Sequence, residues 1–266
     1  SYNQNEDPAD MLAMRERLVD IRPDLEASVE LFGTLKIPQL ERETEYVSLT
    51  HPDRYALYEG DIRSSEGEVI PAAQYNDAIE EYVVPHSTAK HARWNRPEYM
   101  AGALARFNNN HAQLHPAARD VAAALGLEAP CHNPFMITVA QLVECMHCVE
   151  DAIELIDALL ERVINHEDEQ AEVKPRAGRA ASAVEAPRGL LIHEYEYDDE
   201  GKCVFANHVI PTAQNMANLE TDMRKFVPQI VDRSEDRIRL GLEMLVRAYD
   251  PCISCSTHMV HVNFVD

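Results

Sequence analysis

The strongest constraint on the fold is an apolar repeat that runs through residues 134–165. Because an α-helix turns once every 3.6 residues, apolar side chains at alternating three- and four-residue steps fall on one face. The repeat consists of Val139, Leu142, Met146, Val149, Ile153, Ile156, Leu160 and Val163. It predicts one long helix with a single buried seam, which neighbouring helices must cover.

Further helical patterns precede this repeat. Near the N-terminus, the spacing predicts an amphipathic helix in which Pro23 is a break and Gly33 a stop. Its apolar positions are Met11, Met14, Leu18, Ile21, Leu25 and Val29. Residues 40–95 carry prolines and only short alternations, which predict irregular structure with a few strands. Beyond them Pro116 begins a short Ala-rich helix that ends at Gly126.

The pattern changes after the long helix. Residues 166–186 are charged and then contain Ala, Arg and Pro without an apolar face, so we expect a surface connection there. Two apolar-rich runs, 190–197 and 203–210, flank an acidic, glycine-containing loop and predict a β-hairpin. After the hairpin the chain returns to helix.

A last helix is predicted near the C-terminus. Ser234 stands at its N-cap, with Glu235 and Asp236 in the first turn. One face carries Ile238, Leu242, Leu245 and Tyr249. Pro251 ends the helix, because the residue before a proline is pushed out of the α region. Cys252 therefore follows directly after a rigid helix end.

These patterns together predict a mixed, helix-rich α+β fold, with a long-helix bundle and a small β-hairpin region. We expect a mostly helical bundle over residues 1–165, including the irregular segment 40–95. The surface connection follows, then a hairpin and metal-ligand region over 187–258, and a short tail over 259–266.

The charge of the chain excludes several classes of partner. Its formal net charge is -22, which repels nucleic-acid phosphates and anionic lipid surfaces. No stretch approaches the ~20 consecutive apolar residues of a spanning helix, and the acidic first residues do not look like a signal peptide. We therefore expect no nucleic-acid partner, no membrane span and a cytoplasmic location.

Cysteine spacing indicates metal or redox chemistry rather than a secreted disulfide framework. Four of the six cysteines form two C-x-x-C pairs, Cys145/Cys148 and Cys252/Cys255. The second pair lies in the string Asp250–Pro–Cys–Ile–Ser–Cys–Ser–Thr–His258. Two thiolates at this spacing can hold one metal, or one can bind terminally while the other bridges two metals. A structural zinc half-site and two buried thiols are the alternatives at this point.

The string resembles the C-terminal D-P-C-x-x-C-x-x-H signature of nickel-iron hydrogenase large subunits. Ala186–Pro–Arg–Gly189 followed by His193 is similar to that family's A-P-R-G-x-x-x-H segment, and Pro211–Thr212 with Asn215 to its P-T/S-x-x-N segment. Upstream, residues 102–108 are similar to a G-x-x-A-R-x-N stretch of the cytoplasmic, cofactor-linked group. The resemblance covers most of residues 80–258, which is the C-terminal part of such a subunit.

The resemblance implies a nickel-iron centre with carbon monoxide and cyanide on the iron. Cys252 would be a terminal nickel ligand, Cys255 a bridging one, and His258 a ligand of a separate magnesium or iron ion. The Pro187–Arg188 segment, with Pro211 and Thr212, would line the wall around the diatomic ligands. Arg188, held by Asp250, would lie over the open metal position, where its permanent charge polarises hydrogen while the Cys252 thiolate takes the proton.

The family resemblance also implies partners. These are an iron-sulfur small subunit, further acceptor subunits for NAD(P), a deazaflavin or a disulfide reductase, and a maturation endopeptidase that removes the tail beyond His258. The family's other cysteine motif, R-x-C-G-x-C, is absent from these 266 residues. We expect this chain to be inactive alone, and an N-terminal part of the subunit to complete the site if the subunit is split.

Two other functions stay open at this stage. One is a non-catalytic subunit of an electron-transfer complex related to respiratory complex I, which the presence of Cys252 and Cys255 argues against. The other is a simple zinc- or iron-binding protein.

Several single residues have plainer interpretations. Without the flanking motif, Arg188 reads as a salt-bridged structural arginine, and His193 as a hydrogen-bonded strand histidine. Cys145 and Cys148 lie beside the apolar seam, which favours core packing over metal binding. The two remaining cysteines, Cys131 and Cys203, have no evident partner.

Overall fold

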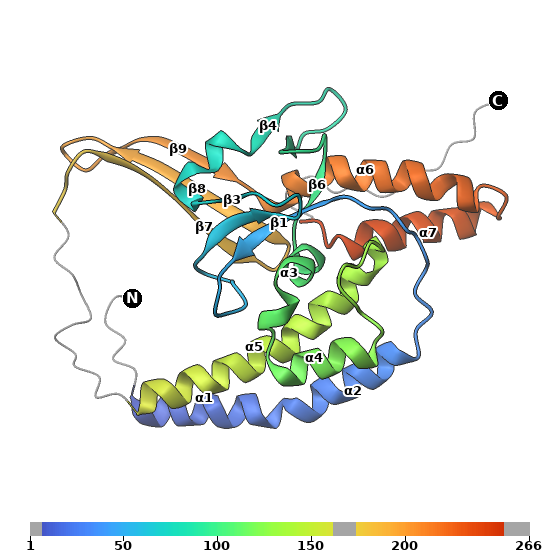
Figure 1. Cartoon of the computed structure of the whole chain (residues 1–266), viewed down its shortest axis with the longest axis horizontal. Coiled ribbons are helices and arrows are strands. Elements are labelled where there is room, and N and C mark those ends of the chain that lie inside the picture. The colour runs from blue at the N-terminus through green and yellow to red at the C-terminus, as the bar shows by residue number, and fades with distance from the viewer. Residues whose placement is uncertain (1–6, 162–173, 253–266) are drawn as a thin grey trace.

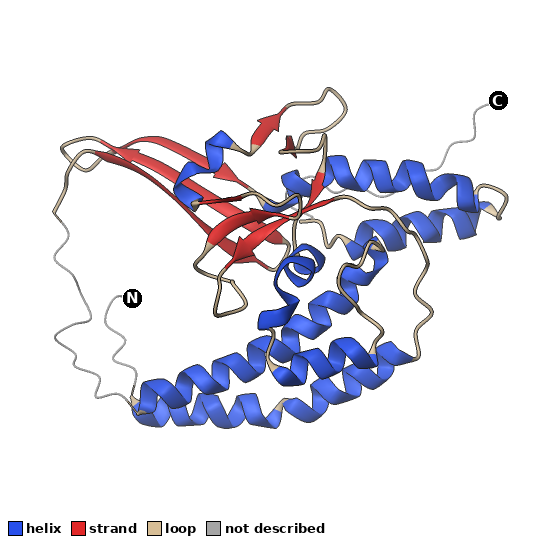
Figure 2. Ribbon diagram, viewed as in Figure 1, coloured by secondary structure: helices blue, strands red, loops and turns tan. Residues whose placement is uncertain are grey.

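The computed structural model describes residues 7–161 and 174–252. A helical bundle forms one side of the molecule, a group of short sheets forms the other, and a pair of long helices extends beside them (Figure 1). Figure 2 shows the strands gathered above the bundle. The predicted mixed, helix-rich α+β fold is confirmed.

The bundle is organised around its longest helix, α5. Four others pack on it: α1 Pro8–Asp20, α2 Arg22–Gly33, α3 Ala103–Asn110 and α4 Pro116–Ala124. Helix α5 spans Ile137–Leu160 and buries five members of the predicted repeat: Val139, Leu142, Met146, Ile153 and Ile156. The predicted long helix is therefore confirmed, while Val163 falls outside the described residues.

The break and stop predicted near the N-terminus are also confirmed. Helices α1 and α2 meet at Ile21, Pro23 stands in the first turn of α2, and α2 ends at Gly33. Both helices are tied to α5 by ion pairs, Arg15 with Asp157 and Arg22 with Glu150.

The segment 40–95 combines irregular chain with short strands, as predicted. Strand β1, Glu45–Thr50, is antiparallel to β2, Asp61–Ser64, and parallel to β6, Tyr99–Met100. Strand β3, Val69–Ile70, completes this sheet beside β2. A separate ribbon pairs β4, Glu80–Tyr82, with β5, His91–Arg93. In the part of the chain that the structure describes, three short 3-10 helices complete the connections: Ala72–Asp77, His111–Gln113 and Pro134–Met136.

The predicted surface connection over 166–186 is wrong for its last part. Gly178–Ala186 forms strand β7, which pairs antiparallel along its whole length with β8, Gly189–Tyr197. Strand β9, Cys203–Val209, pairs on the other side of β8. The predicted hairpin therefore exists as β8 and β9, and β7 extends it to a three-stranded sheet in which β8 is central. Strand β7 lacks an apolar face because its small, mostly exposed side chains lie at a sheet edge, where main-chain pairing alone defines the strand.

Two antiparallel helices follow the sheet. Helix α6 spans Pro211–Ile230 and α7 spans Glu235–Ala248, and they pack side by side (Figure 1). Ser234 is the N-cap residue of α7, but its side chain makes no capping hydrogen bond. The predicted apolar face is buried: Ile238, Leu242, Leu245 and Tyr249.

Two apolar cores hold these parts together. The larger joins the bundle to α6 and α7, and the smaller fills the space between the sheets. Among the helices that the structure describes, none combines the length and apolar character needed to cross a bilayer.

Candidate metal centre

Three chain segments that carry predicted site residues meet at one end of the β7–β8 sheet. Pro187 and Arg188 form the tight turn between the two strands. Pro211 and Thr212 form the first turn of α6. Asp250 and Cys252 follow the end of α7. Cys255 and His258 lie outside the described residues.

The first contact in this cluster joins Arg188 to Asp250. Nε of Arg188 donates to the backbone carbonyl of Asp250, and Nη2 lies 3.3 Å from Oδ1 of its carboxylate. Gln141 on α5 donates to the other carboxylate oxygen at 3.4 Å. Both side chains of the ion pair are 40% exposed, so the guanidinium is held at two points yet accessible.

Asp250 occupies an unusual backbone conformation. Its φ of +47° is left-handed, and its N–H donates to the carbonyl of Arg247, which closes the last turn of α7. Helices often end this way, although glycine is the usual residue because a side chain is strained there. The turn directs the chain away from α7 and sets Asp250 against Arg188.

The second contact joins Cys252 to α6. The N–H of the half-buried Cys252 donates to Oγ1 of Thr212 at 3.3 Å, and Thr212 is 6% exposed. Since Asp250 and Cys252 are separated only by Pro251, the two contacts form one cluster. The cluster thus places a thiol, a guanidinium, a carboxylate and a helix N-terminus within one short loop region.

A buried arginine, Arg106, holds the Pro187–Arg188 turn through hydrogen bonds to its backbone. Arg106 on α3 is 2% exposed, and its guanidinium donates to the carbonyls of Ala186 and Pro187 at 2.9 and 3.1 Å. It also pairs with Glu144 on α5 at 2.6 Å and with Glu185 on β7 at 2.8 Å. Burial acts to lower the pKa of Arg106, but the carboxylates outweigh it and raise that pKa, so the charge persists.

Two side chains from α6 fix the other side of the turn. Nδ2 of Asn215 donates to the carbonyl of Arg188 at 3.3 Å, while its Oδ1 accepts from the N–H of Ala101 at 2.8 Å. Gln214 donates to the carbonyl of Leu190. The carbonyls of residues 186–188 and 190 therefore all accept from side chains, which gives the turn a single position.

Two glycines allow the turn to approach α3 closely. Gly189 has a φ of +135°, and a Cβ there would lie 2.8 Å from the Cβ of Ala101 and 2.8 Å from the N of Gly102. Gly102 has a φ of +107°, and a Cβ there would lie 3.0 Å from the carbonyl oxygen of Arg188. Both positions need a residue without a side chain, for space and for backbone conformation.

Gly189→Ala should therefore lower the free energy of unfolding by roughly 2–4 kcal/mol, which combines a strained backbone with overpacking. Urea unfolding measures the effect. The matched control is Gly178→Ala at the open end of β7, where nothing lies within 4 Å of the new Cβ and φ is not left-handed. Equal stability of the two variants would mean that the close approach does not constrain the turn.

Sequence reasoning missed the support of the turn, although two signals were present. Arg106 is the only charged residue of the predicted segment 102–108, and Glu144 is the only charged residue in the first half of α5. A charged side chain on a helix that must be buried requires a buried group of opposite charge as its partner. Glu185, whose pKa is raised by burial, lies in the segment 166–186, which the sequence pattern predicts to be a surface connection.

The predicted core packing of Cys145 and Cys148 is wrong, because both residues are exposed in this chain. The first half of α5 buries a wide arc that includes Val143, Glu144 and His147, on the side away from the two cysteines.

His193 is hydrogen-bonded on β8 as predicted, with Nδ1 2.9 Å from the hydroxyl of Tyr195.

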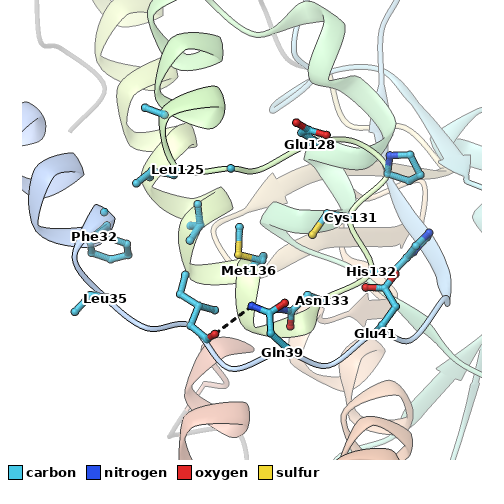
Figure 3. Close-up of a pocket in the computed structure, with 16 residues that line it drawn as sticks. Phe32, Leu35, Gln39, Glu41, Leu125, Glu128, Cys131, His132, Asn133 and Met136 are labelled. Atoms are coloured by element: carbon cyan, nitrogen blue, oxygen red, sulfur yellow. Dashed lines mark hydrogen bonds between the residues drawn. The ribbon is translucent and has the colours of Figure 1, made fainter.

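A separate pocket of about 470 Å³ lies between the end of α2 and the loop after α4 (Figure 3). It is lined by apolar residues such as Phe32 and Leu125 together with Glu41, Cys131 and His132. None of the predicted site residues lines it. Burial raises the pKa of the Cys131 thiol, which makes it a poor nucleophile or metal ligand.

Comparison with solved structures defines the class of protein. A NAD+-reducing NiFe-hydrogenase in the H2-reduced state superposes with a TM-score of 0.73 at 28% identity, over 94% of this chain and 60% of that one. The NiFeSe hydrogenase of D. vulgaris Hildenborough in the reduced state shares the fold at 18% identity, with a TM-score of 0.62 over 93% and 61%. The fold is that of nickel-iron hydrogenases.

The sequence comparison gives the family. The profile described as "Nickel-dependent hydrogenase" matches residues 40–258, and the chain belongs to this family. Sulfhydrogenase 1 subunit alpha of Pyrococcus furiosus is 34% identical over 94% of this chain and 58% of its own length. Sulfhydrogenase 2 subunit alpha of the same organism is 30% identical over 68% and 44%. The chain thus spans less than two thirds of these relatives.

Proposed function

We propose that this chain is the C-terminal part of the catalytic large subunit of a nickel-iron hydrogenase, which cleaves H2 heterolytically and reversibly and passes the electrons to iron-sulfur clusters of a partner subunit. The observation that carries the proposal is the meeting of Arg188, Asp250, Cys252 and Thr212 in one loop cluster. Family membership and the likeness to hydrogenase alpha subunits support it.

The residues present fit a nickel-iron centre by their chemistry. Thiolate sulfur prefers soft and borderline metals, and Cys252 offers such a ligand directly after a rigid helix end. Cys255 would supply a second thiolate to the metal pair, and His258 would hold a magnesium or iron ion. The remaining two thiolates come from the R-x-C-G-x-C motif, supplied by an N-terminal part of the subunit, so the chain alone is inactive.

Thr212 and the first turn of α6 suit the ligands expected on the iron. Oγ1 of Thr212 accepts from the N–H of Cys252, so the hydroxyl proton is free to donate to a cyanide nitrogen. Helix α6 begins at Pro211 without a side-chain cap, and a helix N-terminus favours negative charge. Donors matter here because an unpaired polar ligand in a dry pocket is costly. Pro187 and Pro211 close the wall without adding N–H groups.

When bound, the metal pair supplies the open position at which H2 is polarised. Arg188 keeps its charge and cannot serve as an ordinary base, so its role is to orient and polarise. Asp250 holds the guanidinium through its carbonyl and carboxylate oxygens. In this proposal the proton is accepted at Sγ of Cys252, because Cys252 follows Asp250, the partner of the guanidinium, by only two residues.

The proposal includes the assembly. An iron-sulfur small subunit takes the electrons, and further subunits pass them to NAD(P), a deazaflavin or a disulfide reductase. A maturation endopeptidase removes the tail after His258. The acidic composition and the C-x-x-C spacing favour a cytoplasmic location.

Metal analysis tests the centre directly. The complete, processed subunit purified with its partner should contain nickel and iron together, and Cys252→Ser should lose most of the nickel because one thiolate ligand is removed. Cys203→Ser, on the exposed strand β9, is the control and should keep both metals. Zinc alone, or neither metal, in the unsubstituted protein would leave the simple metal-binding or complex I-like alternatives.

A further inference from the structure

A cluster of two histidines and a glutamate lies apart from the thiolate loop. His86 is in the β4–β5 connection, His91 begins β5, and Glu220 is on the face of α6 that packs against β5. Their nearest ligand atoms all lie within 4.8 Å of one another. We propose that these three side chains form a second metal site, for a borderline divalent cation such as Zn²⁺.

The geometry of the three groups is close to what one ion requires. Nε2 of His86 lies 2.7 Å from Oε1 of Glu220, and Nε2 of His91 lies 3.3 Å from the same oxygen. Two ligand atoms at about 2.1 Å from one tetrahedral ion lie on the order of 3.4 Å apart. Small side-chain adjustments are therefore enough to admit an ion, and its fourth position is left for water.

His91 is the strongest indication that the cluster holds a ligand. It is 2% exposed, and although Nε2 lies 3.3 Å from Oε1 of Glu220, neither ring nitrogen makes a hydrogen bond of acceptable geometry within the described ranges 7–161 and 174–252. Buried polar groups are normally paired, and each exception requires an explanation. A cation would supply a partner for Nε2, the ring nitrogen that faces Glu220. If the cluster were only an ion pair between His86 and Glu220, a second, buried imidazole next to the same carboxylate oxygen would not be needed.

The surroundings hold the ligands in place and leave access. The ring of Tyr82 stacks on His91, with centroids 5.7 Å apart and planes at 25°. Arg224 contacts Oε2 of Glu220 at 3.3 Å, which leaves Oε1 for the imidazoles. Arg224 is 73% exposed, so its charge is well screened by solvent. A hollow of about 140 Å³ opens beside the cluster, lined also by Glu98.

Imidazole and carboxylate together favour zinc and its neighbours over magnesium or calcium, which prefer oxygen alone. Three protein ligands with one open position is the arrangement expected for an accessible ion. The site shares no residue with the Arg188 cluster, so the inference does not depend on the proposed function.

Zinc titration of the assembled subunit tests the site. The unsubstituted protein should bind one equivalent of Zn²⁺ whose X-ray absorption shows nitrogen and oxygen ligands without sulfur. His86→Ala, at an exposed position, and His91→Phe should each weaken this binding by more than the roughly 10–100-fold cost of an outer-shell change, with nickel and iron contents unaltered. His111→Phe, exposed and outside the cluster, is the control and should bind zinc normally.

Two results would overturn the inference. One is unchanged zinc affinity in both His86→Ala and His91→Phe. The other is zinc bound through sulfur in the unsubstituted protein, which would assign it to the cysteines. Because His86 is exposed, its replacement should leave folding intact even if His91→Phe disturbs the packing of β5.

Discussion

Replacing Arg188 by lysine is expected to leave nickel and iron in place and to reduce H2 turnover by at least ~100-fold, the usual effect of removing one preorganised donor from a reaction site. Arg188 contacts Asp250 through two different nitrogens, one to the carbonyl and one to the carboxylate. A lysine ammonium keeps the charge but is a single point, so it cannot keep both contacts and the same orientation. Metal content and H2 oxidation, measured on the same preparation, separate the two effects.

The control for this substitution is Arg179→Lys on β7. Arg179 also forms an ion pair, with Glu194, but lies along the sheet away from the turn. It should retain full turnover. If Arg188→Lys were as active as the control, Arg188 would have only the structural role of a salt-bridged turn residue. If it lost its metals as well, the substitution would have disturbed the loop of Cys252 and not the chemistry alone.

The helices could be predicted because their signals are local. The α5 repeat, the break before Pro23 and the end of α7 shortly before Pro251 each depend on residues close in sequence. Strand β7 could not be predicted in this way, because its nine residues are defined by pairing with β8 and Ala183 is its only buried apolar residue. Strand assignment without an apolar alternation requires knowledge of the partner strand.

The site was predicted through motifs, and its support was not. The D-P-C, A-P-R-G and P-T segments indicated Cys252, Arg188 and Thr212, and the structure brings these segments together. The contacts that hold them join residues 24 to 114 positions apart, such as Gln214 with Leu190 and Ala101 with Asn215. Spacing along one chain carries no information on such pairs. His91 had no pattern around it, and only its burial without a hydrogen-bond partner reveals it.

Arg106→Met should have the largest effect on stability, a loss of about 3–5 kcal/mol in the free energy of unfolding. The substitution keeps an apolar stem of similar length but leaves Glu144 and Glu185 buried without their counter-charge. It also removes the donors to the carbonyls of Ala186 and Pro187. Urea unfolding of the variant measures the loss, and turnover should fall with it because the turn that carries Arg188 loses its support.

The pH dependence of that loss identifies its cause. Burial already raises the pKa of Glu185 above its usual 4.5, and without the charge of Arg106 the main group left to oppose that rise is the N–H of Leu49. A carboxyl whose pKa is higher in the folded than in the unfolded state costs stability as the pH rises above the unfolded value. The deficit of Arg106→Met should therefore be small near pH 5 and full at pH 8. Arg93→Met, which breaks the exposed pair with Glu80, should cost under about 1 kcal/mol at either pH. A pH-independent loss in Arg106→Met would mean that packing, and not the two buried carboxylates, makes Arg106 necessary.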